Sequence, residues 1–390
     1  MPIQSFLDAS FCIYGAGIVA TSIYTAIKTL YYKNPLFFLV SDTVQGQADV
    51  NPTEIDGIAV KRVSEWNRER FRIHYLVAAP VVHQDAIAAS LYSMGVDDEE
   101  ILMLTNEIED RIMEAYYSSL GNCRTISGII SEDRNDKEKL VGYGIGDQRM
   151  TANRRTDYEG RIQVFQAKCH VDQPLRNSVK LPGYIVPIQV GAVFTNERIA
   201  SIQDHQGENI SGKNRNYCEL TATYYAWKHS KADYKGLCHY RRIFDLSEKQ
   251  MQTLLEQEQE WDVILPYPSI HYPDISAQHI RYINEKDWQA LLQALRETAP
   301  EYLEAYERLL MSGEQYFFNY NMLVARAEIF DDYCSFLFRV LGRAEEVAMP
   351  RGWERADRFA GYMGENLTTL YFLANRDRLK TAYAGVRWLV

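Results

Sequence analysis

The sequence predicts an α/β protein of two domains, and three observations support that fold class. With 390 residues, the chain is too long for one ordinary hydrophobic core. In the first 120 residues, short apolar runs alternate with segments of helical periodicity, which is typical of a parallel sheet covered by helices. Apolar strands and helical segments alternate again from residue 160 onward, after a polar, charge-mixed stretch.

Composition and charge narrow the classes of function. The chain is 46% hydrophobic and 24% charged, which is usual for a soluble globular protein. Of the formal net charge of −10, residues 1–120 contribute −8, from 8 Lys and Arg against 16 Asp and Glu, and the remainder contributes −2, from 34 against 36. Neither part has the basic excess that nucleic-acid binding requires, so nucleic acid is not an expected partner.

The chain has no apparent targeting or membrane-spanning segment. No stretch approaches the ~20 apolar residues of a membrane span, and the N-terminus lacks the pattern of a signal peptide. We therefore expect a cytoplasmic protein, with peripheral contact at the inner face of the membrane left open. The six cysteines are scattered without a CxxC pair, so reduced thiols are expected and a zinc cage is not.

Residues 1–120 predict a Rossmann-like, doubly wound domain. A strand at 11–14 runs directly into Gly15-Ala16-Gly17, and a helical pattern follows, which is the context in which such glycines approach a diphosphate. A second strand, residues 36–40, leads to Asp42, whose carboxylate can accept a hydrogen bond from a ribose hydroxyl. Gly15, Gly17 and Asp42 are therefore the predicted nucleotide-binding residues of this domain. Further buried strands are expected at 75–80 and 101–104.

The ligand of the first domain is less defined than its fold. The stretch 55–60, IDGIAV, resembles the small Rossmann-like domain in front of sugar acyltransferases and other polysaccharide-assembly enzymes. In those relatives the domain holds a nucleotide-sugar or serves as a scaffold, and both roles stay open here. A helix over 106–119 is expected to lead out of this domain. Residues 121–159 are the predicted linker region, and the second domain is expected to span 160–390.

Six ordered motifs span much of the second domain. They read DHQGENISGKNRNYCELT (204–221), YKGLCHYRRIF (234–244), DVILPYP (262–268), PEYLEAY (300–306), NYNMLVARAEIFDDYC (319–334) and GYMGENL (361–367). They closely resemble a family of polysaccharide-assembly glycosyltransferases catalogued as domain of unknown function 4422, whose usual wording is close to NISEKNPNYCELT and YIGLCHYRRYF. The resemblance covers nearly all of residues 160–375 and implies an A-type (GT-A-like) α/β glycosyltransferase fold.

The resemblance also implies a reaction. A sugar would pass from a nucleotide-sugar donor, expected to be a UDP-sugar, to a surface-polysaccharide acceptor that is lipid-linked, as in hexosyltransferases. Galactofuranose transfer has been proposed for parts of the family, which makes UDP-galactofuranose one candidate donor. Two departures from the family wording concern Gly212, where Glu is usual, and Asn366, where Arg is usual. Because Asn366 replaces the usual arginine, any phosphate contact that the arginine makes in relatives is lost here.

The expected grip on the leaving diphosphate is provided by arginines. Most A-type enzymes use a divalent metal on an Asp-x-Asp motif at a strand end, and the second domain contains no such motif. His239, Arg241 and Arg242 stand at the corresponding strand end, and guanidinium groups form bidentate hydrogen bonds with phosphate. We therefore expect metal-independent transfer without a cofactor, with Lys213 assisting. The alternatives are an ion-pair cluster that pins the strand and, for His239, a metal ligand or a structural residue.

Two carboxylates are candidates for the general base that an inverting transfer needs. Glu365 is the first choice, because it opens an apolar helical run and a carboxylate at a helix start is stabilised as the anion. The alternative is an ordinary first-turn helix carboxylate. Glu219 is the second choice, and its spacing from Asn216 equally fits a capping box.

Other polar residues of the motifs are expected to line the substrate pocket. Asn209, Ser211 and Asn214 are predicted contacts for nucleotide or sugar hydroxyls, together with Lys213. Asn321 and Met322 are predicted to border the sugar or acceptor pocket.

Two functions outside this class stay open. One is a non-catalytic nucleotide-sugar-binding assembly protein, and the other is an NAD-dependent sugar-modifying enzyme that uses residues 1–120. No hydride-transfer partner residues stand out for the second. The sequence leaves a homo-oligomer open as well.

Overall fold

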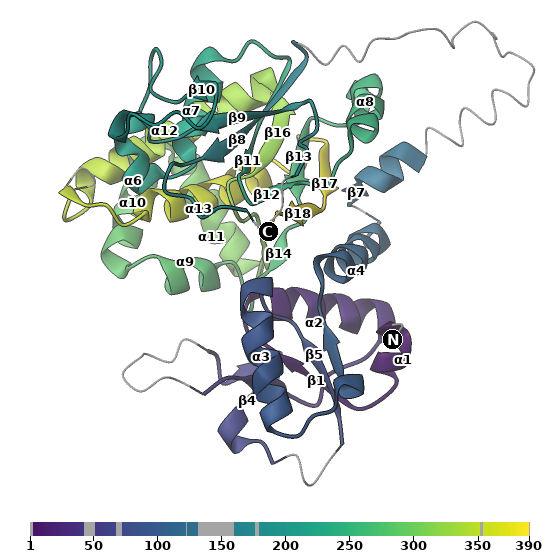
Figure 1. Ribbon diagram of the computed structural model, residues 1–390. Helices are drawn as coiled ribbons and strands as arrows, with labels where there is room; N and C mark the ends of the chain where they lie inside the picture. Colours follow the sequence, from purple (N-terminus) through teal and green to yellow (C-terminus); the bar gives the residue numbers. More distant parts are fainter. Residues whose placement is uncertain are drawn as a thin grey trace, which may run out of the picture. The chain divides into compact units, whose positions relative to one another are not determined.

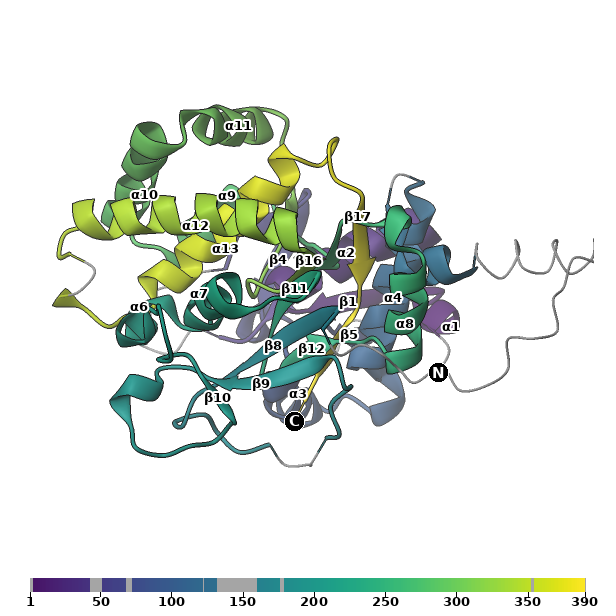
Figure 2. The same ribbon diagram turned by 90° about the horizontal axis from the view of Figure 1, so that it is seen from above.

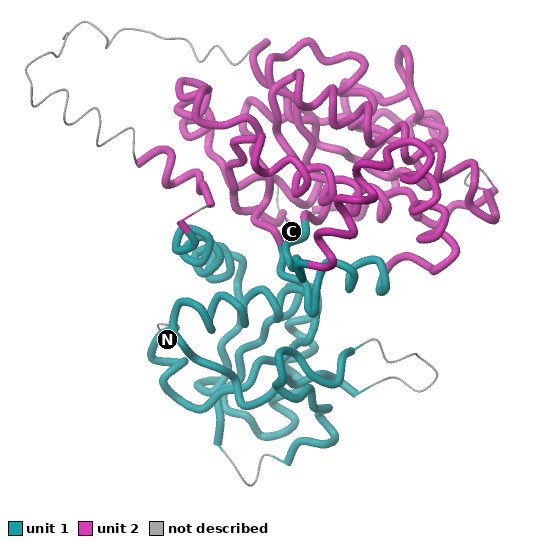
Figure 3. The backbone as a smooth tube through the Cα atoms, turned by 180° about the vertical axis from the view of Figure 1, so that it is seen from behind, with its two compact units in different colours: residues 1–120, 269–281, 312–317 teal, residues 121–268, 282–311, 318–390 magenta. Residues whose placement is uncertain are grey.

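The computed structural model describes residues 3–42, 51–67, 72–121, 123–131, 160–175, 179–351 and 354–389. The chain divides into two compact units (Figure 3). Unit 1 comprises Met1–Leu120, Ser269–Arg281 and Ser312–Phe317, and unit 2 comprises Gly121–Pro268, Tyr282–Met311 and Phe318–Val390.

Two segments far along the sequence belong to unit 1, although the sequence analysis assigned them to the second domain. Residues 269–281 and 312–317 supply β14 (Ser269–Ile270) and β15 (Tyr316–Phe317), which pair antiparallel. The carbonyl of Ile270 accepts a hydrogen bond of 2.6 Å from Thr21 Oγ1, and its N–H donates to Ser22 Oγ at 2.9 Å. These bonds span almost 250 positions of the chain, a pairing that no local pattern predicts.

Unit 1 contains the expected doubly wound sheet (Figure 1). Its strand order is β3-β4-β2-β1-β5-β6, in which all neighbours are parallel except β3 and β4. Counted along the chain, the five parallel strands follow the order 3-2-1-4-5 of a Rossmann fold. The remaining elements of unit 1 are α1 (Ile3–Leu7), β1 (Phe11–Tyr14), α2 (Ile18–Tyr31), β2 (Phe38–Val40), β3 (Glu54–Ile55), β4 (Ile58–Arg62), β5 (His74–Val77), α3 (Val81–Ser93), β6 (Ile101–Met103), α4 (Asn106–Ser119) and α9 (Ser276–Tyr282).

Unit 2 is also an α/β structure, built on a larger mixed sheet. The order is β10-β9-β8-β11-β16-β13-β17-β7, with a β12–β18 ribbon attached to β11. Its strands are β7 (Arg124–Thr125), β8 (Ile162–Lys168), β9 (Ile185–Gln189), β10 (Ile202–Gln203), β11 (Tyr234–His239), β12 (Arg242–Phe244), β13 (Val263–Pro266), β16 (Leu323–Arg326), β17 (Thr381–Ala384) and β18 (Val386–Trp388). Its helices are α6 (Asn214–Tyr217), α7 (Leu220–His229), α8 (Glu248–Glu256), α10 (Glu285–Thr298), α11 (Pro300–Met311), α12 (Ala327–Val347) and α13 (Phe359–Ala374). The α/β fold class predicted for both parts of the chain is confirmed.

Part of the expected linker region lies within unit 2. Arg124–Thr125 forms β7, which adds to the sheet beside β17. Ile126 and Ile129, which follow β7, are buried in the hydrophobic cluster of unit 2. Residues 132–159 of the predicted linker lie outside the described residues.

Alternation along β8 explains how the unit 2 sheet is covered on both faces. Val164 joins a buried cluster with Leu254 of α8 and with Trp261. The next residue, Phe165, points to the opposite face, where its ring meets Tyr225 of α7 at 5.9 Å. Helix α12 packs on the sheet together with α7, and α13 lies beside α12 (Figure 2). The sheet therefore has helices on both sides, as a mostly parallel sheet requires.

Strand direction brings several loops to one edge of this sheet. Strands β8, β9 and β11 are parallel, so their carboxyl ends share an edge. Strand β16 runs antiparallel to β11, with Leu323 opposite Leu237, so the residues just before β16 lie at that same edge. Ligands of α/β proteins bind at such carboxyl edges, which directs attention to the loops there. Among the described residues, no helix combines the length and apolar character needed to cross a membrane.

Candidate active site

The β11–β12 hairpin presents the predicted arginines at the carboxyl edge of the unit 2 sheet. Strand β11 ends at His239, and Arg242 pairs with it as the first residue of β12. The guanidinium carbon of Arg242 lies 4.3 Å from the ring centre of Tyr320 and 4.2 Å from that of Trp388. Its Nε is buried and has no hydrogen-bond partner in the described part of the chain. The cation is thus held between two aromatic faces instead of by a carboxylate.

Two further arginines lie near the same edge. Arg241 extends over the ring of its neighbour Tyr240 at 5.1 Å, and Arg358 directly precedes α13. Neither guanidinium forms an ion pair with a carboxylate among the residues that the structure describes. Both charges act on half-buried Asp172: burial raises the pKa of its carboxyl, while the Cys169 N–H, Arg241, His239 and Arg358 oppose that rise. The predicted arginines and Arg358 therefore share one polar site.

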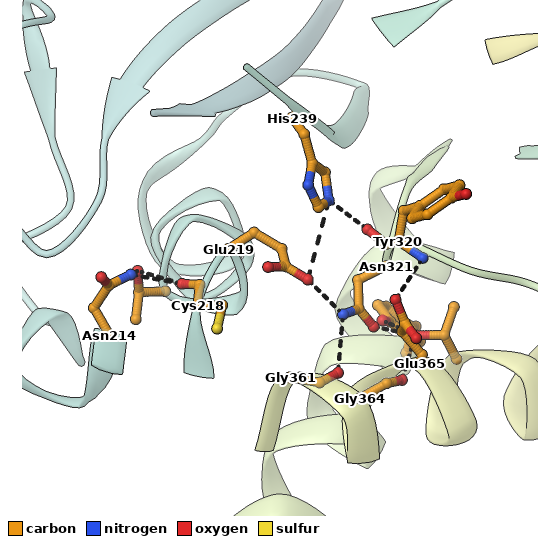
Figure 4. Close-up of polar contacts among 12 residues, drawn as sticks. Asn214, Cys218, Glu219, His239, Tyr320, Asn321, Gly361, Gly364 and Glu365 are labelled. Atoms are coloured by element: carbon orange, nitrogen blue, oxygen red, sulfur yellow. Dashed lines mark hydrogen bonds and ion pairs between the residues drawn. The ribbon is translucent and has the colours of Figure 1, made fainter. Parts of the chain in front are cut away.

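Glu219 and Asn321 form the centre of a buried polar network (Figure 4). The Nδ2 of Asn321 donates to Glu219 Oε1 at 2.7 Å and to the carbonyl of Gly361 at 3.2 Å. Thr368 Oγ1 donates to Asn321 Oδ1 at 3.2 Å. The same Glu219 oxygen lies 4.0 Å from His239 Nε2. The structure therefore brings together Glu219, His239 and Asn321, which the sequence analysis had assigned to three different roles.

Glu365 lies in the same network but not at a helix start. Helix α13 begins at Phe359, so Glu365 is in its second turn, and the expectation that it opens the helix is wrong. Its Oε1 accepts a hydrogen bond of 2.9 Å from the N–H of Tyr320. The carbonyl of Tyr320 accepts from His239 Nε2 at 2.6 Å. Glu365 and His239 thus hold Tyr320 from both sides of its backbone.

The capping-box alternative for Glu219 is also wrong. Helix α7 begins at Leu220, with Glu219 at the N-cap and no side-chain cap hydrogen bond. The chain turns sharply before it, because Cys218 has a φ of 49°. The Glu219 side chain is therefore available to Asn321 and His239.

Backbone strain concentrates around this network. Six non-glycine residues in the described chain have positive φ, and four of them are Cys218, Tyr320, Asn321 and Arg358. Such conformations cost about 1–3 kcal/mol each and persist only where the surroundings fix them. Residues in such conformations cluster at functional sites, which makes this network a candidate for one.

Most of the motif around residues 204–214 belongs to a structural hydrogen-bond network, centred on Asp204, that the sequence analysis missed. Asp204 is fully buried, and its carboxylate accepts four hydrogen bonds. The donors are Gly191 N (2.8 Å), Ala192 N (3.1 Å), Ser211 Oγ (2.6 Å) and Thr221 Oγ1 (2.7 Å). Ser211 is therefore committed to Asp204. The position of Asp204 as the first residue of the motif was the sequence feature that could have indicated this structural role.

The other predicted polar contacts of this motif also have protein partners. Asn209 Nδ2 donates to the carbonyls of His205 and Gly207, and Asn214 Nδ2 donates to that of Cys218. Lys213 Nζ lies 2.5 Å from an oxygen of buried Glu345. Met322 is fully buried in the hydrophobic cluster, so of the pair at 321–322 only Asn321 reaches the polar network. Sequence reasoning missed Asp172, Arg358 and Trp388, because they lie outside the six motifs, and it missed Tyr320 although this residue lies in the motif 319–334 beside Asn321.

The predicted residues of unit 1 form a separate constellation. Gly15, after β1, has a φ of 135°, and a Cβ there would lie 2.3 Å from the carbonyl oxygen of Ala78. Gly17 is the N-cap of α2, and a Cβ there would lie 3.7 Å from Arg281 Nη1. Asp42 accepts hydrogen bonds from Ser64 Oγ (2.6 Å) and Ser64 N (3.1 Å), which lower the pKa of its carboxyl. Close packing explains Gly15, and nucleotide binding by this unit stays a prediction.

No cluster of three or more His, Cys, Asp or Glu side chains in the described ranges is arranged to hold a metal ion. Metal independence itself stays a prediction.

Comparisons with known proteins cover most of unit 2 together with the two late segments of unit 1. The family model described as Domain of unknown function (DUF4422) matches residues 170–376. The fold resembles the apo structure of WbbM, a bifunctional glycosyltransferase, with a TM-score of 0.51 and 24% sequence identity. That match covers 59% of this chain and 45% of the WbbM chain, so this chain corresponds to less than half of that protein. No curated protein sequence matches significantly.

Proposed function

This chain belongs to the DUF4422 family, as its motifs predict, and from that premise we propose that it is a glycosyltransferase. In the proposed reaction, a sugar passes from a nucleotide-sugar donor to a hydroxyl of a saccharide acceptor. WbbM, whose fold this chain resembles, is a bifunctional glycosyltransferase, which supports the proposal. The site at the carboxyl edge of the unit 2 sheet supports it independently.

The observation that carries the proposal is the group of arginines without carboxylate partners. In the described chain, Arg241 and Arg358 act on Asp172, Arg242 and Asp172 both act on His239, and none of the three guanidinium groups forms an ion pair. A nucleoside diphosphate leaves with several negative charges, and preorganised cations that meet developing charge are a major source of rate enhancement. Guanidinium groups match phosphate oxygens in pairs, which an ammonium group does not do.

We propose that these arginines replace the divalent metal of other A-type enzymes. Arg241 and Arg242 closely follow the end of β11, and a strand end is also where those enzymes carry the Asp-x-Asp motif. Lys213 is left out of the proposed clamp, because its ammonium already pairs with Glu345.

Donor and acceptor follow from the family resemblance. The proposed donor is a UDP-sugar, with UDP-galactofuranose as one candidate, and the proposed acceptor is a lipid-linked surface polysaccharide. An enzyme with such an acceptor would act at the inner face of the membrane.

The proposal is tested with the full chain by thermal shift against UDP, GDP, CMP, NAD and several UDP-sugars, each with EDTA and with manganese. A ligand that binds only the native state raises Tm by mass action. We expect UDP compounds to raise Tm in EDTA, and UDP release from the matching sugar to require acceptor. A requirement for manganese would contradict the arginine clamp, and stabilisation by NAD alone would contradict the transferase.

Matched variants locate the binding. Arg241→Ala and Arg242→Ala should each weaken the response to UDP by about 10-fold or more, as expected when a charged hydrogen bond is lost. The control is Arg198→Ala, because the Arg198 guanidinium is exposed and, within the described chain, donates hydrogen bonds to the carbonyls of Thr195 and Glu197 and to no other group. Equal losses in all three variants would indicate nonspecific electrostatics.

A further inference from the structure

The hydrogen bond of His239 to Tyr320 fixes the tautomer of the imidazole. A carbonyl oxygen only accepts, so Nε2 must carry the proton in the 2.6 Å contact with Tyr320 O. The ring therefore has two states available: neutral with a lone pair on Nδ1, or imidazolium with protons on both nitrogens. Only the imidazolium can donate from Nδ1 to a phosphate.

The second ring nitrogen is accessible. Nδ1 of His239 has no hydrogen-bond partner in the described chain, and this atom is not fully buried. The His239 side chain is 15% exposed. Figure 4 shows Nε2 facing Tyr320 and Glu219, whereas the other nitrogen points away from both. A substrate group can therefore approach Nδ1.

The surroundings favour the neutral ring. Burial and the positive charge of Arg242 on β12 lower the pKa of His239. Glu219 at the N-cap of α7, the Tyr320 carbonyl before β16 and Asp172 after β8 act in the opposite direction, and the net shift is downward. At neutral pH the imidazole is therefore uncharged, with its lone pair on Nδ1.

We propose that His239 is the general base of the transfer, accepting the proton of the acceptor hydroxyl on Nδ1, and that it is not a phosphate ligand. This inference rests on the proposed function. In the step, the acceptor oxygen bonds to the anomeric carbon as that carbon's bond to the phosphate oxygen breaks. The hydroxyl proton moves to Nδ1, and the nucleoside diphosphate leaves with the electron pair. The imidazolium then returns the proton to solvent.

The two carboxylates become positioning residues. Glu365 accepts a hydrogen bond from the N–H of Tyr320, and the Tyr320 carbonyl accepts one from His239, so the carboxylate positions the ring through one residue with a positive φ. Glu219 faces the protonated Nε2 at 4.0 Å and stabilises the imidazolium that forms during the step.

The protonation state is tested directly by nitrogen NMR of the full chain labelled on histidine, with His239→Gln to assign the signal. We expect the neutral Nε2–H tautomer at pH 7. An imidazolium or an Nδ1–H tautomer at that pH would overturn the proposal, whatever the activity of the chain.

A pair of amide variants separates a base from a phosphate donor. His239→Gln keeps an N–H near the position of Nε2, and His239→Asn places one near Nδ1. For a base, both variants lose about 10²–10⁴-fold in kcat at saturating donor, while UDP affinity stays within about threefold in His239→Gln. If Nδ1 binds phosphate, His239→Asn keeps UDP affinity and His239→Gln loses it, and this pattern overturns the proposal.

The pH–rate profile distinguishes His239 from Glu365. In Glu365→Gln, we expect a lower kcat but an acidic limb that persists, because His239 still titrates. Loss of that limb in Glu365→Gln would make Glu365 the base and overturn the assignment. A wild-type chain that transfers no sugar overturns the proposed function itself, whereas an active His239→Gln overturns only the base.

Discussion

The two units of this protein both place a polar constellation at the carboxyl ends of parallel strands, but they use it differently. In unit 1, the Gly15 turn packs directly against the backbone of Ala78, and Asp42 is bonded to Ser64. In unit 2, within the described residues, the guanidinium groups of Arg241 and Arg242 have no carboxylate partner. We therefore expect these arginines, which contact aromatic rings and form no ion pair in the part of the chain that the structure describes, to contribute more to ligand binding than the Gly15 turn.

The two units can also be compared by their residues with positive φ. The two non-glycine residues of unit 1 with positive φ are Tyr32, which ends α2, and Asp56, in the turn between β3 and β4. Both are ordinary turn positions. In unit 2, Cys218 likewise ends a helix, α6, and Arg358 is the N-cap of α13. Tyr320 and Asn321 differ, because their backbone and side chains bond to Glu365, His239 and Glu219.

The largest effect is expected in unit 2, from Arg242→Lys. An ammonium cannot stack between Tyr320 and Trp388 or bind phosphate with two parallel hydrogen bonds, so kcat/KM should fall by about 10²–10³. Arg198→Lys, on the exposed surface, should change it less than twofold. Full activity of Arg242→Lys would contradict the proposed role of this arginine, which is the main difference between the two units.

Unit 1 is best examined by a pair of glycine variants. Gly15→Ala should lower the free energy of unfolding of unit 1 by about 3 kcal/mol, because the methyl group meets the Ala78 carbonyl and φ is 135°. Gly17→Ala meets nothing closer than 3.7 Å and should cost less than about 1 kcal/mol. Urea unfolding and hydrogen exchange measure both. Loss of NAD or UDP binding in a stable Gly17→Ala chain would make the turn a functional site.

A pH effect of similar size is expected in unit 1 from His271. Burial, aided by Arg281, lowers the pKa of this histidine from 6.5 to about 4. The unfolded chain therefore binds more protons than the folded chain below pH 6.5. The contribution of neutral His271 to the free energy of unfolding is complete above pH 6.5 and is lost as the pH falls toward 4. The loss should be about 3 kcal/mol.

The measurement compares wild type and His271→Phe by urea unfolding at pH 7 and pH 4. The phenyl ring keeps the packing against Phe317, whose ring centre lies 4.9 Å away, but does not titrate. Identical pH dependence of the two chains would show that His271 is not buried in the neutral form.

The smallest effect is expected from Asp42→Ala. The hydrogen bond between Asp42 and Ser64 is exposed, so water can replace it. The free energy of unfolding should therefore fall by about 1 kcal/mol or less. The informative readout is nucleotide affinity. An unchanged stability with a lost response to NAD or UDP would restore Asp42 to a binding role and weaken the contrast between the units.

Errors in the sequence analysis have specific physical causes. The start of α13 was missed because its N-cap, Arg358, is left-handed and forms no side-chain cap bond. The Asn216–Glu219 spacing suggested a capping box, but the positive φ of Cys218 redirects the chain before α7 begins. Both errors concern strained residues, where local preference is overridden by surrounding contacts.

The sequence by itself determined the α/β class, four strands of unit 1 (β1, β2, β5 and β6), the Gly15 turn, the family, and the position of His239, Arg241 and Arg242 at a strand end. These features depend on periodicity and on residues adjacent in the chain. Only the tertiary structure decided that Trp388 stacks on Arg242, that Glu365 reaches Tyr320, and that residues 269–281 belong to unit 1. Such contacts join segments tens to hundreds of positions apart, and they exist only once strand order and direction are set.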